Sequence, residues 1–353
     1  VRMLLKFVSP LAVGLAVAFC YPLMFYFAEW YGLVGGCTGV TTRPEISGFM
    51  LGALLAAVSG KEFVSRPAFL AGPLLLGFAT GFALPEFFGC PWCVFLQFGY
   101  GHMGRIFEVA GFVFGGWLGV RLIRNGFTIQ NGASVRVRDE WARRLVVATA
   151  VASACYMAWS LDLNYPRQYL AVGIVILIGA ALGAAMQRVR FCVIEGLRNA
   201  LWFRMPSGFI PIASMAAGSL VYALLSGTFS FDFLPDDPLK GLWPTLVKAV
   251  STALASFAFM LSGGCTVWHA VNAGNGTLSG LVFLAGMFLS TLAHRMSGLV
   301  ALERAFAGIL FSGEPRVSHA MRTLSSSVLS LLIAAAVVAS VLLIFRSTLR
   351  SEE

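Results

Sequence analysis

The sequence predicts an all-α polytopic membrane protein with about nine to ten transmembrane helices, short half-membrane helices and two inverted, pseudo-symmetric halves. Composition is the first observation behind this prediction, because 58% of the 353 residues are hydrophobic and only 12% are charged. A soluble globular domain carries about twice that charged fraction, which excludes a soluble enzyme. The second observation is a series of long apolar runs, and the third is a set of short cysteine-bearing segments between them.

The long apolar runs are continuous, whereas the strands of a membrane β-barrel alternate in polarity over about ten residues. Each run approaches the length of roughly 20 residues that an α-helix needs to cross a bilayer. The stretch after the ninth run predicts a short surface helix within 296–322. We expect helical spans at 8–28, 46–63, 68–84, 105–123, 145–161, 169–187, 208–227, 245–262, 278–294 and 325–345.

Shorter apolar pieces, each with a cysteine and glycines, lie between these spans at 33–42, 88–100, 190–203 and 263–275. None of them is long enough to cross a bilayer. Short, glycine-interrupted segments at corresponding places in two halves of a chain point to a transport site. Irregular backbone at membrane depth also needs protein or a cavity to satisfy its polar groups. We therefore expect these pieces to form half-membrane helices.

The net charge of +9 fits the positive-inside bias of membrane proteins better than a nucleic-acid surface, so no nucleic-acid partner is expected. If the short pieces return to the side they enter from, most Lys and Arg residues fall on one side. We assign that side, with both termini, to the cytoplasm of a bacterial inner membrane. The chain is then a single membrane domain, 1–353. It comprises a first half-repeat, a basic cytoplasmic loop, a second half-repeat and a C-terminal surface segment with the last span, at 1–123, 124–144, 145–295 and 296–353.

An internal repeat relates two of the cysteine-bearing pieces. The glycines that follow Cys90 at fixed distances have counterparts at the same distances after Cys265. These matched pairs are Gly99 with Gly274, Gly101 with Gly276 and Gly111 with Gly286. Cys37 and Cys192 form a weaker second pair. In the expected topology Cys90 and Cys265 lie near opposite faces of the membrane, so the halves are predicted to be inverted.

The cysteine elements suggest a path for a soft anion. A Gly–Cys step at the start of a short helix places a polarisable thiol beside backbone N–H groups, which attract anions. Thiols are weak hydrogen-bond donors, so a series of them can pass an anion on without trapping it. Core packing is the alternative for each cysteine, because free cysteine packs as a small hydrophobe. The predicted path residues are Cys37, Cys90, Cys192 and Cys265.

Several neighbours of these cysteines are accessory candidates, namely Gly89, Cys93, Glu195, Arg198, Gly264 and His269. Charges near a bilayer are costly and mark function by default. The alternative for Arg198 is extension to the cytoplasmic surface, and the alternative for Glu195 is pairing with Arg198 or Asn199. His269 either faces a vestibule or packs at an interface. The histidines are dispersed and no second Cys-x-x-Cys occurs, so neither a metal nor a cofactor is expected.

Two other functions remain open. Cys90 and Cys93 have the spacing of a redox motif, which a membrane thiol–disulfide oxidoreductase would use, although no βαβ context accompanies them. The basic loop would also suit a membrane scaffold for a cytoplasmic sulfur-carrier protein. Cys20 and Cys155 lie within spans without neighbouring glycines, and we expect both to pack inside the protein.

Over residues 30–300 the chain resembles the YeeE/YedE family of membrane proteins associated with sulfur-compound transport, and it is most similar to the branch linked with selenium metabolism. Four pieces carry the resemblance: Arg43-Pro44-Glu45-Ile46 leading into Gly48 and Gly52, Gly89-Cys90-Pro91-Trp92, Gln187-Arg188-Val189-Arg190-Phe191-Cys192 with Arg198, and Gly263-Gly264-Cys265. Cys93 and Glu195 depart from the expected pattern.

The resemblance implies a pseudo-symmetric helical fold and uptake of thiosulfate or a related small species past a row of cysteines. The expected function is therefore an inner-membrane transporter, and not an enzyme. Its expected partners are small inorganic sulfur or selenium species, the lipid bilayer and a cytoplasmic sulfur-carrier protein.

Overall fold

The computed structural model describes residues 2–30, 44–83, 91–129, 134–160, 166–231, 242–295 and 319–350. Its architecture is helical throughout apart from one pair of two-residue strands. The long helices are α1 (Arg2–Trp30), α2 (Pro44–Ser59), α3 (Ala71–Ala83), α5 (Ile106–Arg124), α6 (Asp139–Ser160), α7 (Pro166–Val189), α9 (Ile210–Ser226), α10 (Leu242–Ser262), α12 (Leu278–Arg295) and α14 (His319–Arg350). The all-helical fold class is confirmed, and every predicted span coincides with one of these helices.

Shorter helices occupy three of the four predicted half-membrane pieces. They are α4 (Pro91–Gly99), α8 (Val193–Trp202) and α11 (Thr266–Gly274). Two 3₁₀ turns precede long helices, η3 (Met103–Arg105) before α5 and η4 (Pro206–Phe209) before α9. The fourth piece, 33–42, and the surface helix predicted within 296–322 fall largely outside the described residues.

The protein has the surface expected of a membrane-embedded chain. Four segments are long and apolar enough to cross a membrane: Met103–Arg124, Tyr169–Trp202, Pro206–Ser226 and Thr245–Gly274. Shorter apolar helical stretches accompany them at Pro10–Met24, Glu45–Ser59, Ala71–Ala83, Leu278–Ser290 and Val328–Ile344. Large apolar side chains such as Leu177, Leu225 and Leu343 are exposed, which fits a bilayer as the surrounding solvent.

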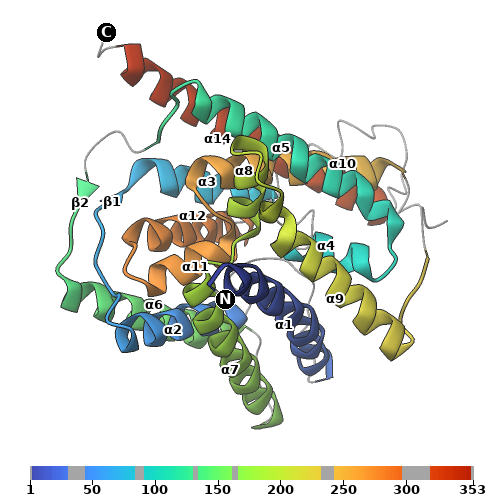
Figure 1. Cartoon of the computed structure of the whole chain (residues 1–353). Helices are drawn as coiled ribbons and strands as arrows, with labels where there is room; N and C mark the ends of the chain where they lie inside the picture. The colour runs from blue at the N-terminus through green and yellow to red at the C-terminus, as the bar shows by residue number, and fades with distance from the viewer. Residues whose placement is uncertain are drawn as a thin grey trace.

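The long helices pack in pairs that are distant in sequence. Helix α2 packs on α7 and α1 on α9, while α3 packs on α12 and α5 on α10. The short helices fit between these pairs, with α4 against α9 and α11 against α2. In Figure 1, α5, α10 and α14 run along one side of the molecule, α1 and α7 lie on the opposite side, and α11 and α12 lie between them.

Small residues bring the paired helices close together. A Cβ atom on Gly52 of α2 would lie 1.9 Å from the backbone oxygen of Ala180 in α7. One on Gly111 of α5 would lie 2.2 Å from the backbone oxygen of Ala249 in α10. Because apolar burial gives helices little reason to associate in lipid, close backbone approach at small residues is the usual source of packing energy there.

Part of the basic cytoplasmic loop predicted at 124–144 forms a strand and the start of a helix. Helix α6 already begins at Asp139, where Asp139 and Glu140 favour the positive end of the helix. Strand β2 (Ser134–Val135) pairs antiparallel with β1 (Ala68–Phe69). The Asp139 carboxylate also accepts a hydrogen bond from the backbone N–H of Ser65 at 2.9 Å. These contacts tie the segment to the start of the chain's third span.

Candidate functional site

Seven of the ten predicted site residues lie in described parts of the chain. Cys37, Gly89 and Cys90 lie outside the described residues. The other seven are distributed over three short helices and the turns that lead into them. They are Cys93 on α4, Cys192, Glu195 and Arg198 at or on α8, and Gly264, Cys265 and His269 at or on α11.

Cys192 and Cys265 each occupy the position immediately before a short helix. Both have extended backbone conformations, with φ −146° and ψ 126° at Cys192 and φ −76° and ψ 171° at Cys265. This is the usual geometry of a residue that starts a helix. Both cysteines are free thiols, and their exposed fractions are 2% and 0%. Each thiol therefore lies beside backbone N–H groups that have no partner within their own helix.

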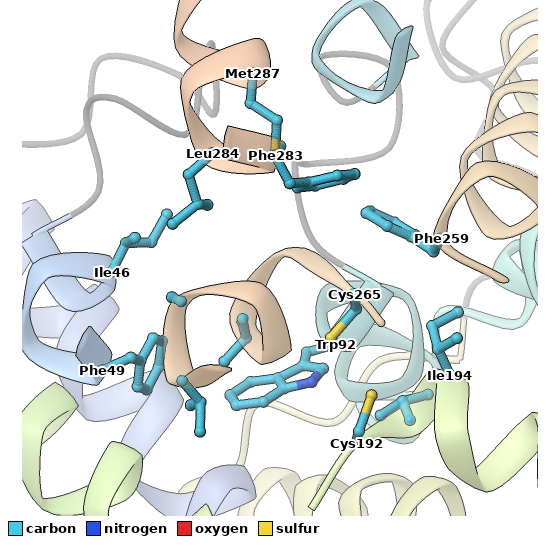
Figure 2. Packing of buried hydrophobic residues seen from close by; sticks show 14 of the residues in the cluster. Ile46, Phe49, Trp92, Cys192, Ile194, Phe259, Cys265, Phe283, Leu284 and Met287 are labelled. Carbon is cyan, nitrogen blue, oxygen red and sulfur yellow. The ribbon is translucent and has the colours of Figure 1, made fainter. Parts of the chain in front are cut away.

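The two thiols meet in the interior, although the sequence had placed Cys192 and Cys265 in different pairs. Their side chains interact through a hydrogen bond, and the backbone N–H of Cys265 also interacts with the Cys192 sulfur. Figure 2 shows the two sulfur atoms pointing toward one another. The structure thus brings together two predicted path residues that are separated by the whole of α8 to α10.

Trp92 supplies the third part of this site. It is the second residue of α4, and its side chain is completely buried. The indole packs edge-to-face against Phe49, with ring centroids 5.7 Å apart, and against Phe191 at 6.3 Å. Figure 2 shows the indole beside the two cysteines, with its nitrogen on the side of the sulfur atoms. The first turns of α4, α8 and α11 therefore converge on one point, which we call the cysteine site (Trp92, Cys192 and Cys265).

Two polar groups at the cysteine site lack protein partners. Within the described residues, neither Nε1 of Trp92 nor Oγ1 of Thr266 has a hydrogen-bond partner, and both atoms are buried. Most buried polar groups are hydrogen-bonded, so each exception calls for an explanation. Helix starts also carry partial positive charge. The site thus combines backbone N–H groups at helix starts, two weak thiol donors and an unpaired indole donor, which is a set suited to an anion.

The predicted charged neighbours lie on α8, with Glu195 about one turn and Arg198 nearly two turns beyond Cys192. Arg198 and Glu195 form an ion pair of 3.7 Å, and both side chains are about one-third exposed. This confirms the predicted pairing of Glu195 with Arg198. Glu195 repels negative charge at Cys192 electrostatically. The pairing with Arg198 partly offsets that repulsion, because opposite charges this close cancel much of each other's field.

His269 and Gly264 serve the packing of α11. The His269 ring is buried, its Nε2 lies 3.0 Å from the Ser262 hydroxyl, and it stacks on Phe283 with centroids 3.9 Å apart. His269 therefore packs between helices, as one of the two predictions had it, and does not face a vestibule. A Cβ on Gly264 would lie 2.2 Å from Cδ1 of Trp268. Glycine is required there because the Trp268 ring lies across the backbone.

The remaining described cysteines have different environments. Cys93 is buried in α4, and its sulfur lies 3.0 Å from the Tyr21 hydroxyl of α1. Cys20 is partly buried against the core. Cys155 is exposed on α6, so the prediction that it packs inside the protein is wrong. The continuous apolar run concealed this, because in a lipid-facing helix the outer side is as apolar as the inner side.

The predicted repeat is visible in the backbone of the two segments α4–α5 and α11–α12. Gly101 and Gly276 both have left-handed φ values, 97° and 92°. The N–H of Gly101 donates to Phe98 at 3.1 Å, and the N–H of Gly276 donates to Ala273 at 3.0 Å. The repeat glycines therefore mark an identical turn after each half-helix. Positive φ favours glycine at such positions.

The close contacts around these turns correspond as well. A Cβ on Gly99 would lie 2.4 Å from the backbone oxygen of Ala216 in α9, and one on Gly274 would lie 2.4 Å from that of Met50 in α2. The half-helices α4 and α11 thus approach their partner helices through equivalent glycines. These equivalent glycines allow both short helices, which supply two of the three helix starts at the cysteine site, to pack closely on their partner helices.

Sequence reasoning missed the aromatic and hydroxyl members of the site. Trp92 had been noticed only as part of a motif, while Phe49, Phe191 and Thr266 had not been assigned any role. Phe191 and Thr266 directly adjoin the two cysteines in sequence, so their positions were an available signal. Phe49 comes from another helix, and its proximity depends on how α2 packs against α11.

Comparisons with known proteins assign neither a family nor a function to the chain. The chain matches no known protein-family model, and no curated protein matches it. Among the described residues, no group of three or more His, Cys, Asp or Glu side chains is placed to hold a metal ion. The chemistry of the cysteine site therefore has to be argued from its own geometry.

Proposed function

We propose that this protein is a bacterial inner-membrane transporter, related to the YeeE/YedE family, that takes up a small sulfur- or selenium-containing anion such as thiosulfate. The single observation that carries the proposal is the meeting of the Cys192 and Cys265 thiols where α8 and α11 begin. Structural cysteines pack well without lying at converging helix starts. An anion path requires that arrangement, because helix N-termini stabilise negative charge.

The physical character of the site favours a soft, polarisable anion. Phe49, Phe191 and Trp92 surround it, so an ion that enters must lose its water shell. Thiol S–H groups are weak donors and replace only part of that hydration. Thiosulfate, with a polarisable terminal sulfur, loses less on this exchange than a compact, strongly hydrated ion. Weak binding at successive sites is also what conduction requires.

The helix packing supports two inverted repeats as the frame of the transporter. Exchanging α1 with α7, α2 with α9, α3 with α10, α4 with α11 and α5 with α12 converts the main contacts among these ten helices into other observed ones, while α6 and α14 have no counterpart in this exchange. The α1–α9 contact becomes α7–α2, the α3–α12 contact becomes α10–α5, and the α4–α9 contact becomes α11–α2. In transporters built from inverted repeats the substrate site lies between the repeats. This supports a site where Trp92 of the first predicted half lies beside Cys192 and Cys265 of the second.

Both thiols are buried and in contact, so an anion reaches them only when the surrounding helices separate. We therefore propose that the described conformation is a closed one. Opening exposes the site to one side at a time in alternating-access transporters built from inverted repeats. With both termini and the basic segments in the cytoplasm, uptake runs toward the side with more Lys and Arg residues.

The test is uptake of ³⁵S-labelled thiosulfate by the purified protein in liposomes. We expect Cys192→Ser and Cys265→Ser each to lower the initial rate at least about tenfold, because a hydroxyl is less polarisable than a thiol and suits a soft anion poorly. Cys155→Ser is the matched control, since Cys155 is exposed on α6 far along the chain from either helix start. It should leave the rate unchanged.

The outcome also separates the competing functions. Full uptake by both cysteine variants would contradict the proposed path. A requirement for Cys90 and Cys93 alone would instead favour the thiol–disulfide oxidoreductase. Absence of uptake by the unaltered protein, together with retention of a sulfur-carrier protein on its basic surface, would favour the scaffold.

A further inference from the structure

The fully buried Trp92 side chain carries a donor, its Nε1–H, without a hydrogen-bond partner among the described residues. A buried Trp N–H usually finds a partner, and leaving it unpaired costs stability. Phenylalanine would fill the same aromatic setting between Phe49 and Phe191 without that cost. The indole nitrogen therefore needs an explanation other than packing.

The orientation of the Trp92 indole places its N–H toward the two cysteines. Figure 2 shows the nitrogen on the edge of the ring that faces Cys192 and Cys265. The same region contains the starts of α8 and α11, which attract negative charge. The repeat offers no second copy of this donor, because Val267 occupies the matching position on α11. The indole N–H of Trp92 therefore has no equivalent at the matching position of α11.

We propose that the Trp92 indole N–H donates a hydrogen bond to the transported anion and determines its specificity, an inference that rests on the proposed transport function. Thiols are weak donors suited to a polarisable sulfur or selenium atom. An indole N–H is a stronger donor suited to an oxygen. The site therefore recognises an anion with two different ends, a soft atom held by the thiols of Cys192 and Cys265 and an oxygen held by Trp92.

This assignment predicts discrimination between two sulfur species. Thiosulfate has both a terminal sulfur and sulfonate oxygens, whereas hydrosulfide has no oxygen. Removing a hydrogen bond to a charged ligand typically weakens binding about tenfold or more. Trp92→Phe should therefore weaken thiosulfate binding by about that factor and leave hydrosulfide binding within roughly threefold of the unaltered protein. Trp117→Phe is the matched control, since Trp117 lies on the exposed face of α5.

The experiment follows the indole N–H directly. Protein labelled with ¹⁵N at its tryptophan side chains is reconstituted in detergent micelles and titrated with thiosulfate, or with hydrosulfide under anaerobic conditions. The signal that disappears in Trp92→Phe should move on addition of thiosulfate and move little with hydrosulfide. If Trp92→Phe does not fold, single replacement of the other tryptophans assigns the signal by elimination.

Failure of this inference is distinct from failure of the transport function. If thiosulfate binds and is transported but the Trp92 signal stays fixed, the donor role is overturned and the transporter stands. An equal response to hydrosulfide overturns the proposed specificity. If neither binding nor uptake of thiosulfate occurs, the transport function and this inference fall together.

Discussion

The segments α4–α5 and α11–α12 share the turn that follows a short helix and differ in their side chains. Both begin with a half-helix, pass through a turn with a left-handed glycine, and continue into a long apolar helix. Yet Trp92 corresponds to Val267, and Cys93 corresponds to Trp268. The comparison shows that the two segments share a backbone turn, while the side chains at matching positions have different chemical properties.

The divergence is strongest one turn into the long helices. In α5, Glu108 is buried, pairs with Arg105, and is attracted electrostatically by Lys248 of α10. The matching position in α12 is Phe283, which stacks on His269. One half thus uses a charged cluster where the other uses stacked rings. The charged cluster and the stacked rings both pack the long helix that follows the short one. The shared turn therefore does not determine which of the two arrangements is present.

The largest expected effect comes from making the first half resemble the second at this position. Glu108→Leu removes the carboxylate that faces Arg105 and leaves the guanidinium in an apolar surrounding. Breaking a buried ion pair in this way costs about 3–5 kcal/mol. We expect the free energy of unfolding, measured in detergent by tryptophan fluorescence, to fall by about that amount.

A double variant sharpens this test of Glu108. Glu108→Leu combined with Arg105→Leu should recover most of the lost stability, because two apolar side chains can replace a buried ion pair at little cost. If the double variant is as unstable as the sum of the single ones, Arg105 and Glu108 act independently and the cluster is not the structural counterpart of His269 and Phe283.

An intermediate effect is expected from the glycines that both halves share. Gly99→Ala and Gly274→Ala would each place a Cβ 2.4 Å from a backbone oxygen of the partner helix. Overpacking of this kind costs about 1–3 kcal/mol, and we expect similar losses at both positions in thermal unfolding. Gly173→Ala in α7 is the control, since nothing lies within 4 Å of its added Cβ. Very unequal losses would show that the two half-helices are not held equivalently.

The smallest effect is expected at a contact between α4 and α1. Tyr21→Phe removes the hydroxyl that lies 3.0 Å from the Cys93 sulfur and leaves the ring in place. A typical hydrogen bond contributes about 1 kcal/mol, and a bond to sulfur should give no more. We expect a small drop in melting temperature and an increased reaction of Cys93 with a thiol reagent. Unchanged reactivity would mean that packing alone protects Cys93.

Much of the helical architecture followed from the amino-acid pattern. The apolar runs predicted the long helices, and the glycine-rich breaks predicted α4, α8 and α11. These signals are local, because bilayer thickness sets the length of a span and glycine marks the turns. The two-residue strands at Ala68–Phe69 and Ser134–Val135 were not predicted, since pairing of so short a pair depends on segments distant in sequence.

By itself, the sequence determined the apolar, membrane-embedded character and the order of the helices, and it singled out the glycine spacings and the cysteines Cys192 and Cys265 as candidates. Only the tertiary structure decided which of these elements meet. It joined two cysteines from different predicted pairs, placed Trp92 and Phe191 around them, and turned His269 into the core. The physical reason is that composition and spacing report the surrounding solvent and the local geometry, whereas contacts such as that between Cys192 and Cys265 arise from packing between helices far apart in the chain.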